Sequence, residues 1–119
     1  MADLETKKLD APEETRSFDK GMAELVSVGG TTIGRFTFNP GWKWSESVKP
    51  IVGTDSCQNH HQGVSLTGHM HVVGEEGTEI EIGPDEAYNI PPGHDAWVIG
   101  TEPFVGFEFK SAAQYAKPS

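Results

Sequence analysis

The chain has 119 residues, which sets a single compact domain as the expectation. Its 14 glycines and 8 prolines favour short strands and tight turns over a helical bundle. Eighteen acidic against nine basic residues give a net charge of −9. We therefore expect repulsion from phosphate backbones and anionic membrane surfaces, and neither nucleic acid nor a membrane as a partner.

The single cysteine cannot form an internal disulfide, and residues 1–16 lack the apolar core of a secretory signal, so we expect a cytoplasmic protein. Residues 51–109 contain ten of the 18 acidic residues but no lysine or arginine. This half of the chain is either a solvated acidic surface or the source of a negative field that attracts cations or repels anionic ligands. A metal site placed here would sit in a favourable potential under both interpretations.

The first half of the chain begins with a polar, charged segment and continues with segments in which apolar and polar residues alternate. Residues 1–17 are charged and without period, which predicts an arm that is either mobile or packed along a sheet edge. Alternating apolar residues predict strands over 23–28 and 31–38. Residues 42–58 mix tryptophans with polar residues, and we expect a loop that becomes a strand near Cys57.

The second half reads as a series of short strands separated by turns. The expected strands cover residues 61–67, 69–73, 78–82, 87–90, 97–99 and 104–109. Pro91-Pro92-Gly93 is the strongest break between them, and residues 111–116 are expected to form a helical turn. About eight or nine short strands with almost no helix predict an all-β sandwich or barrel.

Five histidines and one cysteine are the residues most suited to chemistry. Thiolate and imidazole ligands together suit zinc, copper or iron better than magnesium or calcium. On an extended strand Cys57 and His61 share one face, whereas His60 points the other way. With His94 from a separate strand they would provide three ligands and leave a fourth position open. The alternatives are that Cys57 is an inert buried side chain and that the histidines are ordinary core or surface residues.

The remaining candidates are ranked lower. His69 and His71 face one side of a strand, and nothing in the sequence decides whether that side is inward. A nucleophilic pair of Cys57 with a histidine is possible but lacks an evident oxyanion device. The aromatic side chains of Trp44, Tyr88 and Trp97 are expected to line the interior and contact a small molecule, with core packing as the alternative.

The region from about Leu25 to Phe109 resembles the cupin superfamily of small β-barrels, whose first motif reads G-x5-H-x-H-x3,4-E-x6-G. The segment from His61 to Gly68 is similar to the end of that motif, with His61 at the position of the glutamate. The family spacing places Asp55 and Cys57 where the two histidines stand in other members.

The second motif, G-x5-P-x-G-x2-H-x3-N, is similar to the Pro91-Pro92-Gly93 segment. Its histidine position is occupied by Ala96, and His94 lies two residues earlier. Another register of the first motif, from Gly63 to Gly83, also fits by letter. We reject it because its glutamate, Glu76, precedes a glycine at a predicted turn.

The resemblance implies a single-domain cupin-like β-barrel, that is, a double-stranded β-helix or jelly roll, over residues 21–110. An N-terminal arm (1–20) and a C-terminal tail (111–119) would flank it, and a homodimer is the expected oligomer. A divalent transition metal (Zn, Fe, Mn or Cu) would be held by a Cys/His set in place of the usual family ligands: Cys57 and His61 at positions of the first motif, and His94 close to the histidine position of the second.

Three functions follow from these observations. The first is a metal-dependent cupin enzyme of oxygenase, isomerase or lyase type that acts on a small molecule in the barrel interior. The second is a metal-free barrel that binds or senses a small molecule without catalysis. The third is a metal-free structural remnant, in which His60, His69 and His71 are surface residues.

Overall fold

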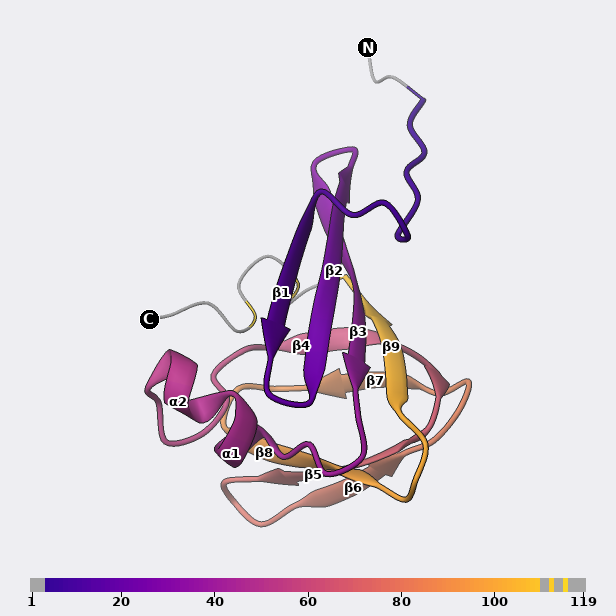
Figure 1. Ribbon diagram of the computed structural model, residues 1–119. Helices are drawn as coiled ribbons and strands as arrows, with labels where there is room; N and C mark the ends of the chain where they lie inside the picture. The colour runs from indigo at the N-terminus through magenta and orange to yellow at the C-terminus, as the bar shows by residue number, and fades with distance from the viewer. Residues whose placement is uncertain (1–3, 110–111, 113–114, 116–119) are drawn as a thin grey trace.

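The computed structural model describes residues 4–109, 112 and 115, and its strands form two antiparallel sheets that face each other (Figure 1). The larger sheet has the strand order β1 (Glu14–Phe18), β2 (Gly21–Val28), β3 (Thr31–Phe38), β9 (Phe104–Glu108), β4 (His61–Thr67) and β7 (Ala87–Ile90). The smaller sheet has the order β6 (Glu79–Ile82), β5 (His69–Gly74) and β8 (His94–Ile99). The all-β prediction is confirmed.

The core fills the space between the two sheets because the strands alternate in burial. In β3, Gly34, Phe36 and Phe38 are buried and the residues between them are partly exposed. The facing strand β8 buries His94, Ala96 and Val98 in the same period-2 pattern. Inward positions of both sheets therefore meet in one apolar interior.

The segment between β3 and β4 differs from the prediction. Instead of a loop, it contains two short helices, α1 (Trp44–Ser47) and α2 (Lys49–Val52). Trp44 and Val48 are four residues apart and both fully buried, so this segment follows a helical period that its polar residues obscure in the sequence. Near Cys57, where a strand was expected, the chain forms only an isolated antiparallel bridge with His94.

Only the end of the N-terminal segment packs along the sheet edge, which was one of the two alternatives for residues 1–17, whereas residues 4–13 form no strand and are mostly exposed. Strand β1 pairs antiparallel with β2 along its whole length. The strand predicted at 97–99 starts three residues earlier, at His94. Of the helical turn predicted at 111–116 and the tail at 111–119, only residues 112 and 115 are described, so both predictions lie outside the described residues.

An arginine of β1 ties the chain beyond β9 to the sheet. The Arg16 guanidinium donates from Nη1 to the backbone carbonyls of Ala112 (3.0 Å) and Tyr115 (2.7 Å). Ala112 and Tyr115 are both buried, and the Tyr115 ring packs against Phe36 with 5.0 Å between centroids. Within the described part of the chain, no helix has the length and apolarity needed to cross a membrane.

Candidate metal centre

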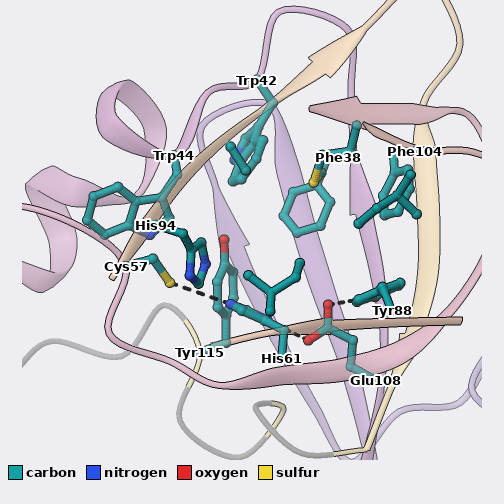
Figure 2. Close-up of a pocket in the computed structure, with 14 residues that line it drawn as sticks. Phe38, Trp42, Trp44, Cys57, His61, Tyr88, His94, Phe104, Glu108 and Tyr115 are labelled. Atoms are coloured by element: carbon teal, nitrogen blue, oxygen red, sulfur yellow. Dashed lines mark hydrogen bonds and ion pairs between the residues drawn. The ribbon is translucent and has the colours of Figure 1, made fainter. Parts of the chain in front are cut away.

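Three segments meet at one end of the interior and bring together Cys57, His61 and His94 (Figure 2). His61 is the first residue of β4 and His94 the first of β8. Cys57 is fixed beside His94 by a backbone bridge in which the Cys57 amide donates to the His94 carbonyl at 2.8 Å. The candidate ligand atoms all lie within 4.8 Å of one another, and all three residues are buried.

Each imidazole is oriented by a second partner at its Nδ1 atom. Nδ1 of His94 donates to the carbonyl oxygen of Pro91 at 2.8 Å. Because a carbonyl can only accept, Nδ1 carries the proton and Nε2 keeps a lone pair. Nδ1 of His61 lies 2.7 Å from Oε1 of Glu108, and its Nε2 lies 3.5 Å from Sγ of Cys57. The geometry therefore leaves both Nε2 atoms available as ligands.

Glu108 lies beside the cluster and is a residue that the sequence analysis did not select. Its carboxylate is buried and also accepts a hydrogen bond from the Tyr88 hydroxyl at 2.8 Å. Burial and the charge of Glu108 raise the pKa of Tyr88, so Tyr88 remains a donor. The sequence held a partial signal for this residue, because Glu108 lies on the same face of its strand as Phe104. However, Phe107 lies on the opposite face, so the sequence did not show which of the two faces is buried.

The cluster has the electrostatics of an ion pair. Burial alone would raise the pKa of Cys57, but hydrogen bonds and charges from His61 and His94 outweigh it and lower that pKa to about 6. Burial likewise disfavours charge on His61, but the Glu108 carboxylate and Cys57 raise its pKa to about 10. A thiolate beside an imidazolium is therefore the neutral-pH state of these side chains when no metal replaces the proton.

The cluster opens onto a small cavity between the sheets. About 20 Å³ is accessible to the centre of a water-sized sphere, which is room for a water, an ion or a ligand of very few atoms. The cavity is lined by Phe38, Trp42, Trp44, Cys57, His61, Met70, Ile82, Tyr88, Ile90, His94, Ala96, Phe104, Glu108 and Tyr115. Polar groups are few and lie among apolar walls.

Two of the three aromatic residues expected at the cavity line it, and the third does not. Trp44 and Tyr88 are lining residues. Trp97 lies on the outer face of β8, because its neighbours in the period-2 alternation point inward. There it stacks on His71 at 4.8 Å between centroids, and Nζ of Lys43 lies 5.2 Å from its ring centroid. The expectation for Trp97 is corrected accordingly.

The other histidines and Asp55 lie outside the cluster. Asp55 is exposed at the surface, 3.9 Å from Nζ of Lys49. His60 is bonded to Oδ1 of Asn89 at 2.5 Å, and His69 is exposed. The side chain of His71, against Trp97, lies on the outer face of the smaller sheet. Neither His69 nor His71 therefore joins the three clustered residues, in line with their lower rank in the sequence analysis.

Tyr115 is the second cavity residue that the sequence analysis missed. Its ring meets His61 edge-on with 5.3 Å between centroids, and burial raises the pKa of its hydroxyl well above the ordinary value. No sequence signal pointed to it, because it follows the last predicted strand and belongs to no motif.

No family model and no curated protein matches the sequence. Solved structures are similar to it in fold. A protein of unknown function from Rhizobium leguminosarum aligns with a TM-score of 0.58 and 14% identity, covering 91% of this chain and 97% of that one. A cupin-like protein from Thermotoga maritima aligns at 0.53 and 14%, covering 77% and 68%. KdgF from a Halomonas species aligns at 0.52 and 20%, covering 77% and 81%.

Proposed function

We propose that this chain, a small single-domain barrel with the cupin fold, binds one divalent transition metal through Cys57, His61 and His94 and uses it to bind and activate a small molecule. One observation carries the proposal: three buried ligand atoms from separate segments lie within 4.8 Å of one another. A metal would bind all three groups at once, in place of the hydrogen bond between Cys57 and His61.

The surroundings of the three residues suit a metal. One thiolate and two imidazoles are a donor set for zinc, copper or iron. Both imidazoles have an outer partner at Nδ1, the Glu108 carboxylate and the Pro91 carbonyl, as metal-bound histidines usually do. The lowered pKa of Cys57 means that its thiol loses a proton readily at neutral pH, which is the form that binds metals.

A divalent metal with an open coordination position would act as a Lewis acid toward an oxygen atom of a bound molecule. The protein side chains would hold the ion, orient its ligands and shield it from bulk water. Cys57, His61 and His94 would hold the ion, and Glu108 would fix the His61 ring. The apolar walls, including Phe38 and Phe104, would exclude bulk water.

The second hypothesis, a metal-free barrel that binds an apolar molecule between aromatic rings, has less support. The cavity of about 20 Å³ is far smaller than the pockets that hold drug-sized ligands, which span roughly 300–1,000 Å³. Trp97, one of the three aromatic side chains in that hypothesis, faces away from the interior. We therefore favour the metal-dependent function.

The test is metal analysis of protein purified without a histidine tag, followed by titration of metal-free protein with Co²⁺ and Zn²⁺. We expect about one ion per chain in the wild type and little or none in Cys57→Ala and His94→Ala. His71→Ala is the matched control, because it removes an imidazole from the outer face. Circular dichroism would verify that each variant folds. Wild-type protein that takes up no ion, or Cys57→Ala protein that binds as well as the wild type, would refute the proposal.

A further inference from the structure

Two buried side-chain groups among the described residues have no hydrogen-bond partner: Nε1 of Trp42 and the hydroxyl of Tyr115. Both side chains line the cavity beside Cys57, His61 and His94. An indole N–H can only donate, and a tyrosine hydroxyl is protonated at neutral pH and can donate as well. Buried donors rarely stay unpaired in native proteins, so each such group calls for an explanation.

The Tyr115 hydroxyl is held in place by contacts around its ring. Phe36 and Phe18 lie 5.0 and 5.9 Å from it, centroid to centroid, and His61 lies 5.3 Å away. Its backbone carbonyl accepts the hydrogen bond from Arg16. In Figure 2 the ring stands beside His61 and His94, with the hydroxyl at its inner end. The group is therefore fixed before any ligand arrives.

We propose that the Tyr115 hydroxyl positions the ligand by donating a hydrogen bond to an oxygen atom of a small carboxylate-type anion bound in the cavity. This inference rests on the proposed metal site, because none of the lining residues is a lysine or arginine and the metal would supply the positive charge.

Cavity size and chemistry define the class of ligand. A volume of about 20 Å³ admits only a few heavy atoms, which favours a group the size of formate. The unpaired groups are donors, so the ligand must offer acceptors, and an anionic oxygen accepts more strongly than a neutral one. The unpaired Trp42 indole adds a second donor in the same cavity for the same kind of ligand.

The experiment compares wild type, Tyr115→Phe and Trp97→Phe in two states, metal-free and loaded with Co²⁺, with formate as the probe. Formate binding is followed by the visible spectrum of the Co²⁺ protein and by saturation-transfer NMR on the metal-free protein. Tyr115→Phe removes one oxygen and keeps the ring packing. Trp97→Phe is the matched control, because it also removes one hydrogen-bond donor, but from a side chain on the outer face of β8 that does not line the cavity.

We expect formate to bind roughly tenfold to hundredfold more weakly to Co²⁺-loaded Tyr115→Phe than to the wild type, the range for a lost hydrogen bond to a charged group. Trp97→Phe should stay within about twofold of the wild type in that state, because its side chain lies outside the cavity. Equal formate affinity in wild type and Tyr115→Phe, equal losses in both variants, or no formate binding to the Co²⁺ protein would overturn the inference and leave the metal site standing.

Absence of Co²⁺ binding would instead refute the metal site and, with it, the positive charge on which the inference rests, so that only formate binding to the metal-free protein through Tyr115 would then uphold the inference. Saturation transfer to formate in the wild type that is lost in Tyr115→Phe would support Tyr115 as the ligand donor. No transfer in either protein, or the same transfer in both, would overturn it.

Discussion

The Glu108 carboxylate lies 2.7 Å from Nδ1 of His61, and both side chains are almost completely buried, with 4% and 6% of their surface exposed. On the outer face, Glu79 lies at the same distance from Nε2 of His71, but those side chains are 57% and 24% exposed. Two pairs with equal distances thus differ in their environment. Water screens the outer pair, whereas the inner pair interacts in a medium of low dielectric constant.

Glu108→Gln should weaken metal binding by about tenfold to hundredfold, as expected for loss of an outer partner that orients a metal-bound histidine. The substitution keeps the shape of the side chain but removes the charge that raises the pKa of His61. Competition of the protein with a chromophoric zinc chelator would measure the affinity. Glu79→Gln is the control and should leave it unchanged, and an equal effect of both substitutions would show that general surface charge is responsible.

The metal-free protein should titrate a cysteine far below its ordinary pKa. The ultraviolet absorbance of the thiolate is expected to appear with a midpoint near pH 6, the lowered pKa of Cys57. Cys57→Ser should lack this step. A midpoint near the ordinary value of 9.0 would contradict the ion pair with His61.

The same pair predicts how the stability of the metal-free protein depends on pH. The contribution of Cys57 is complete above its unfolded pKa of 9.0 and is lost as the pH falls through about 6. The contribution of His61 is complete below 6.5 and is lost as the pH rises through about 10. Urea unfolding across this range should show stability falling at both ends, and the fall should be smaller in Cys57→Ala.

Trp44 and Trp97 should respond very differently to truncation. Trp44→Ala removes a side chain that is 2% exposed and lines the cavity, at an expected cost of about 3–5 kcal/mol in the free energy of unfolding. Trp97→Ala removes the outer stack with His71 and the contact with Lys43, each worth about 1 kcal/mol. Metal affinity should persist in Trp97→Ala, and its loss there would contradict the outward placement of this residue.

Gly68 joins β4 to β5, and alanine at this position should destabilise the protein strongly. Gly68 and Gly77 both have positive φ angles, +80° and +91°, so alanine would strain the backbone at either site by about 1–2 kcal/mol. At Gly68 the added methyl group would also collide with the Pro103 backbone, whereas at Gly77 it would meet nothing within 4 Å. Thermal unfolding should therefore show a larger loss for Gly68→Ala, and equal losses would refute the collision.

Much of the barrel could be predicted because its strands are short, alternating and bounded by glycine or proline. The strand at 61–67 has the predicted bounds, since Gly68 ends it with a left-handed backbone conformation. The cupin resemblance also pointed to the right fold. The helices at 44–52 were missed because two four-residue turns are too short for a helical period to stand out against polar neighbours.

The site was predicted only in part. The spacing of residues along a strand shows which face of the strand a side chain occupies, but not which side chains of other segments it contacts. Period-2 alternation correctly placed Cys57 and His61 on one face. It could not find Glu108 or Tyr115, whose roles depend on the packing of β9 and of the chain beyond it. It also gave no means to orient Trp97 until the start of β8 at His94 was known.

Arg16 gives the N-terminal strand a role that its exposed surface conceals. Its guanidinium donates hydrogen bonds to the carbonyls of Ala112 and Tyr115. Strand β1 is thereby joined to Tyr115, which lines the cavity, although no residue of β1 lines it. Loss of the Arg16 guanidinium would remove both hydrogen bonds, so a change in this outer strand would reach the wall of an interior cavity without altering any of the three clustered residues.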